Sequence, residues 1–133
     1  MKRSAAVILF AFILGDCSTK NASLSLANVV DSLNEDGIHF TEINDIDPDY
    51  AFKKVLNDVN PTLFSVNNNQ MLSIYVFSSN AGVDAGIKEF ENKTATADLE
   101  PYERYSIDNV LIFYILKEVP KNTDVVTAIE RIQ

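Results

Sequence analysis

Hydrophobic residues near the start of the folded part recur at the spacing of an amphipathic helix. Four of them stand at i, i+3, i+4 and i+7 and so share one helical face: Leu26, Val29, Val30 and Leu33. Ser23 or Ser25 can cap the start of this helix, and Gly37 stands where a left-handed residue commonly ends one. The pattern therefore predicts a helix that ends before Gly37.

Similar spacings predict further helices along the chain. Ser79 or Asn80 can cap a helix whose shared face holds Val83, Ile87 and Phe90. Thr123 can cap a last helix, whose apolar residues are Val125, Val126, Ile129 and Ile132. A shorter apolar pattern predicts a short helix within residues 50–59.

Runs of β-forming residues predict two hairpins. Residues 62–66 pair with 71–77 across the polar link 67–70, and residues 102–107 pair with 110–117. The second link is Asp108-Asn109, a two-residue turn of the kind that favours I′ geometry. Residues 38–43 are also rich in β-formers and predict a further strand.

Each predicted hairpin is followed by a predicted helix, and the two units have similar sequences. Because short links place sequential strands side by side, we predict an antiparallel sheet of four or five strands built from two ββα units. The expected fold class is α+β, a two-layer sandwich with the helices on one face of the sheet. Residues 110–116 are apolar throughout, which fits a central strand covered on both sides or a strand whose outer face docks a partner.

The N-terminus has the pattern of a secretory signal. Lys2 and Arg3 precede an unbroken apolar run at residues 5–14, after which the chain becomes polar. Ten apolar residues are too few for a membrane-spanning helix, which needs about 20. We therefore predict a signal peptide at residues 1–16, in preference to a transmembrane anchor or a buried N-terminal helix.

Cys17 directly follows this segment, in the sequence Leu14-Gly15-Asp16-Cys17. The stretch resembles a bacterial lipoprotein signal, which implies a thioether from Cys17 to diacylglycerol, acyl chains such as palmitate, and two anchors in the membrane. Asp16 departs from the Gly, Ala or Ser usual before the cysteine. Ordinary signal cleavage and an incidental cysteine are the alternatives. On the favoured interpretation residues 17–23 are a tether and residues 24–133 form one α+β domain.

Composition and charge narrow the function classes. The chain has 133 residues, 47% of them hydrophobic, and a net charge of -8. Loss of residues 1–16 leaves 9 basic and 18 acidic residues, a net charge of -9. Such a body is unsuited to nucleic acid and is repelled by anionic lipid, so the lipid anchor has to provide membrane attachment. One cysteine excludes an internal disulfide and any multi-cysteine metal site.

Two polar features could support metal binding or catalysis. Asp45, Asp47 and Asp49 imitate the start of an EF-hand loop, but Tyr50 stands where that loop needs Gly and Leu56 where it needs Glu. A solvated acidic loop is therefore preferred to a metal site. The single imidazole, His39, falls in a predicted strand and is interpreted as an ordinary strand residue. We expect no catalytic residues, no metal and no cofactor.

The tyrosines in or near the hairpins raise the question of a docking face. They are Tyr75, Tyr102, Tyr105 and Tyr114. Tyrosine is common in sheets and at interfaces because it joins a large ring to a hydroxyl. Because side chains alternate along a strand, Tyr75 should point to the opposite face of the sheet from Ile74 and Val76. Ordinary sheet covering is the first interpretation, and a functional docking face is the second.

Three segments carry a likeness to a family: Ile74-Tyr75-Val76-Phe77, residues 86–95 with the sequence GIKEFENKTA, and residues 105–114 with the sequence YSIDNVLIFY. They resemble small exported lipoproteins of Bacillus-like Gram-positive bacteria. The resemblance implies that the protein is exported and supports the predicted fold. It does not supply an activity or a site residue.

These observations predict a membrane-anchored extracytoplasmic lipoprotein that acts as a non-enzymatic binding or accessory module. Its expected partners are the membrane, through the lipid anchor, and a protein. The alternatives are a secreted inhibitor or immunity-like protein, whose acidic surface would engage a basic target, and a small extracytoplasmic enzyme using His39 and the acidic loop.

Overall fold

The computed structural model describes residues 23–66, 69–117 and 120–132. The predicted signal peptide, Cys17 and residues 18–22 of the predicted tether lie outside the described residues. The elements in chain order are α2 (Leu26–Glu35), β1 (Phe40–Glu42), the 3-10 helix η1 (Ala51–Lys53), β2 (Thr62–Val66), β3 (Gln70–Val76), α3 (Asn80–Lys93), β4 (Tyr102–Ile107), β5 (Val110–Ile115) and α4 (Thr123–Glu130).

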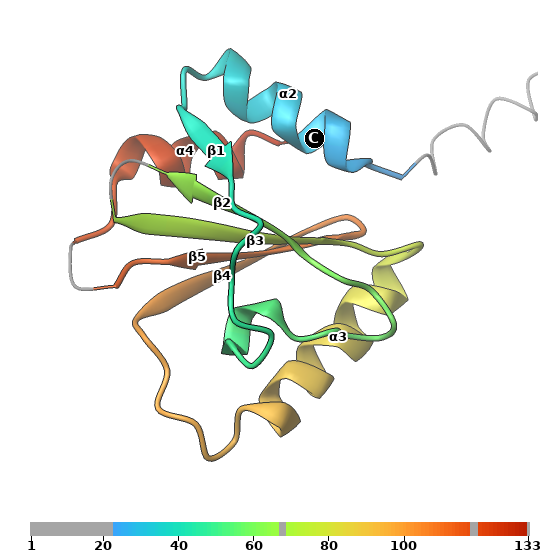
Figure 1. The fold of residues 1–133 in the computed structure, drawn as a ribbon. Helices are drawn as coiled ribbons and strands as arrows, with labels where there is room; N and C mark the ends of the chain where they lie inside the picture. The colour runs from blue at the N-terminus through green and yellow to red at the C-terminus, as the bar shows by residue number, and fades with distance from the viewer. Residues whose placement is uncertain (1–22, 67–68, 118–119, 133) are drawn as a thin grey trace, which may run out of the picture.

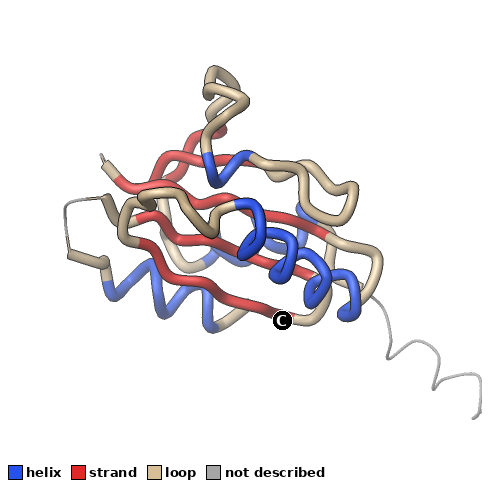
Figure 2. The backbone as a smooth tube through the Cα atoms, turned by 90° about the horizontal axis from the view of Figure 1, so that it is seen from below, coloured by secondary structure: helices blue, strands red, loops and turns tan. Residues whose placement is uncertain are grey.

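The strands form one antiparallel sheet in the order β1-β2-β3-β5-β4. They lie side by side in a single layer (Figure 2). Both predicted hairpins are present, with Val66 opposite Gln70 and Ile107 opposite Val110. Asp108 has a φ of 51°, but Asn109 does not have a positive φ, so the link is a two-residue turn without the predicted I′ geometry, which needs a positive φ at both positions. The α+β class and the five-stranded antiparallel sheet are confirmed.

The helices cover both faces of this sheet, so the prediction of helices on one face is wrong. Helices α2 and α4 pack on one face, which we call the α2/α4 face, and α3 and η1 pack on the other, the α3 face (Figure 1). The reason lies in β5, where both sets of alternating side chains are apolar and every residue is fully buried. A single helical layer would leave half of them in water.

The two ββα units therefore differ in space although their sequences are similar. Leu72 of β3 packs on the α2/α4 face, whereas Leu111, its counterpart in β5, packs on the α3 face. Helix α3, which follows the β2–β3 hairpin, packs on the α3 face. Helix α4, which follows the β4–β5 hairpin, packs on the α2/α4 face. Similar strand patterns thus give two differently placed helices.

Helix starts follow the capping signals closely. Ser25 caps α2 and forms a reciprocal capping box with Asn28, and Ser79 caps α3. The cap of α4 is Asn122, one residue before the predicted Thr123, because its amide oxygen accepts from the N–H groups of Asp124 and Val125. Each cap satisfies backbone donors that the first turn leaves unpaired.

The predicted helix within residues 50–59 is reduced to the short η1. Asn57 and Asp58 have φ values of 47° and 62°, which are incompatible with helix continuation. The chain there makes a tight turn in which Leu56 and Val59 bond to each other's backbone. Phe52 and Leu56 are still buried in the α3 face, as their apolar spacing indicates.

Aromatic rings form the core of the α3 face. Phe113 of β5 lies at its centre, with ring centroids of Phe90, Phe52 and Tyr102 at 4.4, 5.5 and 5.8 Å. Side-chain hydroxyls attach η1 to the sheet, because Ser73 donates to the carbonyl of Phe52 and Tyr75 to that of Lys54. This face is thus closed by rings and by two hydrogen bonds, of which that of Ser73 is buried and that of Tyr75 partly buried.

Candidate functional site

The start of the described chain is held by one buried asparagine. Asn109 Oδ1 accepts from the N–H of Leu24 at 2.8 Å, and Asn109 Nδ2 donates to the carbonyls of Leu24 at 2.9 Å and Phe77 at 2.8 Å. Asn109 is only 2% exposed. Its amide therefore ties the residues before α2 to the β4–β5 turn and to the end of β3.

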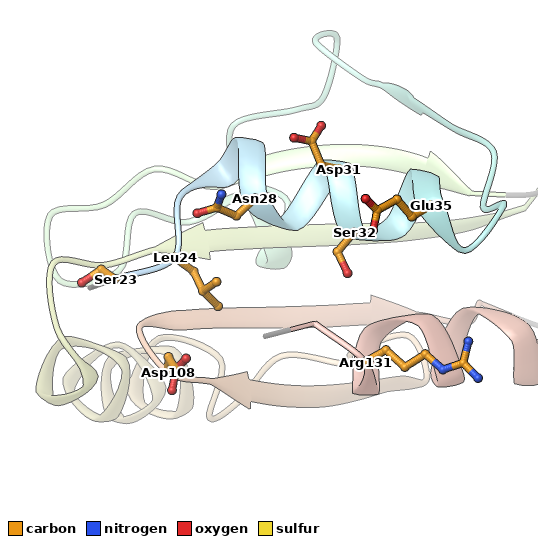
Figure 3. A pocket seen from close by; sticks show the side chains of 8 residues that line it. All are labelled: Ser23, Leu24, Asn28, Asp31, Ser32, Glu35, Asp108 and Arg131. Atoms are coloured by element: carbon orange, nitrogen blue, oxygen red, sulfur yellow. The ribbon is translucent and has the colours of Figure 1, made fainter. Parts of the chain in front are cut away.

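Next to this contact lies an open groove of about 560 Å³. It lies between α2, the β4–β5 turn and the end of α4, and its lining residues are Ser23, Leu24, Asn28, Asp31, Ser32, Glu35, Asp108 and Arg131 (Figure 3). Leu24 and Ser32 point from the α2 side toward the side where Asp108 and Arg131 lie. We call this feature the α2 groove.

Carboxylates outnumber cations in the α2 groove. Asp31, Glu35 and Asp108 line it together with one cation, Arg131. Arg131 is itself engaged by Asp36, with Nη1 and Oδ1 3.3 Å apart, although this pair is exposed and adds little stability. The groove can therefore attract positively charged groups and form hydrogen bonds with them through Asn28 and the serines.

The described residues that line the α2 groove offer serine hydroxyls and carboxylates, and no histidine, cysteine or lysine is among them. A hydroxyl nucleophile needs a neighbouring base that can accept its proton. None of the hydrogen bonds found for the described residues joins Ser23 or Ser32 to a carboxylate side chain.

A second pocket, of about 280 Å³, lies beside the acidic loop. Asp45 and Asp47 line it with Tyr50, Met71 and Lys117, as do Ile46 and Glu100. The Tyr50 hydroxyl donates to Glu100 Oε1 at 2.7 Å. Burial and this carboxylate raise the pKa of Tyr50 well above its usual range, so the hydroxyl stays protonated and is unsuited to act as a base.

The acidic loop and His39 are not brought together as a site. His39 is exposed just before β1 and does not line the pocket that Asp45 and Asp47 share. Asp47 Oδ1 accepts from the N–H of Asp49 at 2.9 Å, a local turn contact. Among the described residues, no group of three or more His, Cys, Asp or Glu side chains is placed to hold a metal ion.

The four tyrosines do not form a common docking face. Tyr75 and Tyr114 are completely buried, and they lie on opposite faces of the sheet. Tyr102 is half-buried on the α3 face and Tyr105 half-buried on the α2/α4 face. Three-dimensional packing thus favours the first interpretation, in which these rings cover the sheet.

Tyr114 has a structural task instead. Its hydroxyl donates to Gln70 Oε1 and accepts from the N–H of Asn122 at 3.0 Å, while Gln70 Nε2 donates to the carbonyl of Pro120 at 2.9 Å. These bonds fix the residue that caps α4 against the middle of the sheet. Local sequence patterns do not indicate this network, because its members are far apart along the chain.

Buried tyrosines predict a loss of stability at high pH. Burial raises the pKa of Tyr75 well above its usual value, with a smaller contribution from the Glu89 carboxylate. In the unfolded chain, a tyrosine hydroxyl ionises at about pH 10. Because the folded state keeps its proton where the unfolded state loses it, stability is complete below pH ~10 and falls above it.

The test compares wild type with Tyr75→Phe by urea denaturation at about pH 8 and about pH 11. The variant loses the bond to Lys54 and is less stable at the lower pH, by about 1 kcal/mol. It should then lose less stability than wild type on raising the pH, by up to ~1.4 kcal/mol per unit above pH ~10. Equal losses of stability in the two proteins on raising the pH would refute a raised pKa of Tyr75.

Comparisons with protein-family models, curated proteins and solved structures find no match for this chain. Among the described residues, no helix has the length and apolar character needed to cross a bilayer.

Proposed function

We propose that the chain is an exported lipoprotein, held on the outer face of a bacterial membrane by lipid on Cys17, whose domain is a non-enzymatic binding or accessory module. The basic residues, the short apolar run and Cys17 support export and anchoring. The α2 groove carries the binding proposal, because it is open, rich in hydrogen-bonding groups and lined by three carboxylates. No cofactor enters this proposal.

The charge of the α2 groove favours a partner with a basic segment. An inhibitor or immunity-like role is the version of the proposal in which that partner is a toxic or enzymatic protein. The proposal of an enzyme using His39 and the acidic loop has less support, since His39 does not line the pocket formed there. A basic protein partner thus agrees best with the groove.

Membrane attachment is tested by changing Cys17. In the full chain expressed with its signal, wild type is expected in the membrane fraction and Cys17→Ala in the soluble exported fraction, because the thioether cannot form. Ser18→Ala is the control and should remain with the membrane. Wild type in the soluble fraction, or Cys17→Ala still in the membrane, would contradict the proposal.

Charge recognition is tested with a lysine-rich peptide as probe. Asp31→Asn together with Glu35→Gln should weaken its binding by about fivefold, because exposed ion pairs are worth about 0.2–1 kcal/mol each. Raising salt should weaken binding to the wild type, since exposed charges are screened beyond about 8 Å at 0.15 M. Titration calorimetry or fluorescence anisotropy measures both effects.

The matched control removes two charges elsewhere. Asp84 lies on α3, Asp98 lies in the loop after it, and both are exposed. Asp84→Asn with Asp98→Asn should change binding less than twofold by the same estimate for distant exposed charges. Equal losses in the two double variants would show that net charge alone attracts the peptide, and would remove the groove as the site.

A further inference from the structure

A further pocket adjoins the α2 groove at Arg131. Its volume is about 250 Å³, and it lies between residues 36–38, which follow α2, and the side of α4 that carries Asp124 and Thr127. Among the described residues, Arg131 alone lines both this pocket and the α2 groove. We call the new feature the α4 pocket.

The α2 groove and the α4 pocket follow one another along the molecule. The α2 residues that line the groove end at Glu35, and the lining of the α4 pocket begins at Asp36. Asn28 to Glu35 is about 10 Å along α2, and Asp124 to Arg131 is about 10 Å along α4. The two together match the length of about six residues of extended chain.

Carboxylates lie on both sides of the junction that Arg131 forms. Asp31 and Glu35 line the α2 groove, and Asp36 and Asp124 line the α4 pocket. Opposite charges across an interface favour association, so basic side chains of one extended segment are attracted on both sides. Such a segment has to pass Arg131 in between.

Arg131 decides which residue type suits the middle of such a segment. Its side chain is 66% exposed, and within the described part of the chain its guanidinium donates only to Asp36, from Nη1 to Oδ1 at 3.3 Å. Figure 3 shows the Arg131 side chain extending away from Asp108. Arginine has five N–H donors in a planar fork that bonds carboxylates in pairs. A partner's carboxylate can therefore bond there, whereas a partner's cation is repelled.

We propose that the α2 groove and the α4 pocket together bind one extended segment of the partner, in which basic residues flank a single acidic residue that Arg131 recognises. The proposal rests on the basic partner proposed for the α2 groove and adds the charge pattern of that partner. Arg131 is then a specificity-determining residue, because it favours a basic, acidic, basic pattern over an unbroken run of lysines.

The experiment measures the binding of three peptides to the full chain by fluorescence anisotropy. Each peptide has three lysines on either side of a central residue, which is Glu, Gln or Lys. Wild type should bind the Glu peptide at least as tightly as the Gln peptide. Arg131→Gln should bind the Glu peptide about fivefold more weakly than the Gln peptide, the upper value for one exposed ion pair. The same variant should bind the Lys peptide more tightly than wild type does.

Arg104→Gln is the matched control. Arg104 is also exposed and also pairs with one carboxylate, since its Nη1 lies 3.4 Å from Oε2 of Glu91, but it belongs to β4 and lines neither the α2 groove nor the α4 pocket. This variant should keep the wild-type order of the three peptides. The same ratio of Glu to Gln affinity in Arg131→Gln as in wild type, or an equal shift in Arg104→Gln, would overturn the role of Arg131.

The part of the α4 pocket is tested with Asp124→Asn. The Glu peptide should bind this variant about two- to fivefold more weakly, whereas Asp84→Asn, an exposed change on α3, should leave its binding within twofold. Equal effects would overturn the two-pocket site. If wild type binds none of the peptides, the proposed basic partner fails as well; binding with an unchanged peptide order in Arg131→Gln removes the charge pattern alone.

Discussion

Replacing Phe113 by alanine is expected to lower the free energy of unfolding by about 4 kcal/mol. Phe113 is fully buried, and its ring lies 4.4 to 6.0 Å from those of Phe90, Phe52, Tyr102 and Tyr75. Alanine removes the apolar burial, leaves a cavity among rigid rings and loses several aromatic contacts together. Domains of this size have about 5–15 kcal/mol of stability in total, so the variant should lose between about a quarter and four-fifths of it.

Phe40→Ala is the matched control for this change. Phe40 lies on the edge strand β1, is half-buried and makes an edge contact with Phe64 at 5.1 Å. Because its site is partly open to water, the same substitution should cost about 1–2 kcal/mol there. Urea denaturation of both variants measures the difference. Equal costs would mean that the α3 face is not the rigid aromatic core described here.

Replacing Asn109 by alanine is expected to cost about 3 kcal/mol. The change removes three hydrogen bonds and leaves the N–H and carbonyl of Leu24 and the carbonyl of Phe77 without their side-chain partner. Buried backbone groups that lose a partner cost about 1–3 kcal/mol each, reduced where water can enter. The loss should be concentrated at the start of α2, so Leu24 N–H should exchange with solvent much faster.

Asn69→Ala controls for the loss of an asparagine in a turn. Asn69 is exposed in the β2–β3 link, so its replacement should change stability by less than about 0.5 kcal/mol. Denaturant unfolding and amide hydrogen exchange read out both variants. A neutral Asn109→Ala, or exchange at Leu24 unchanged from wild type, would contradict the role assigned to Asn109.

The hairpins could be predicted because their signals are local. The Asp108-Asn109 link and the flanking β-forming runs specify a tight turn within a few residues, and Asp108 takes the positive φ that such a turn needs. Caps at Ser25 and Ser79 are equally local, since each side chain bonds to a backbone N–H three residues on.

The placement of the helices could not be read from such local signals. Apolar residues on both sides of β5 indicate covering on two faces, yet they do not say which helix goes to which face. That choice depends on packing between segments distant in sequence, such as Phe90 of α3 against Phe113. The single-face prediction failed at this point.

The α2 groove was also beyond sequence reasoning. Leu24, Asp108 and Arg131 line it together although they are widely separated along the chain, and each taken alone is an ordinary residue. Asn109 was recognised as a turn residue, but its second task depends on Leu24 reaching it, 85 residues away. For the tyrosines the first interpretation, sheet covering, agrees with the packing, because Tyr75 and Tyr114 are completely buried.

Lipid attachment at Cys17 is the central part of the proposed function, and mass spectrometry of the membrane-extracted protein tests it most directly. The mature chain should begin at Cys17, with the mass of an S-diacylglyceryl group on its N-terminal residue. A chain that begins at any other residue, or one that begins at Cys17 without added lipid, would contradict it.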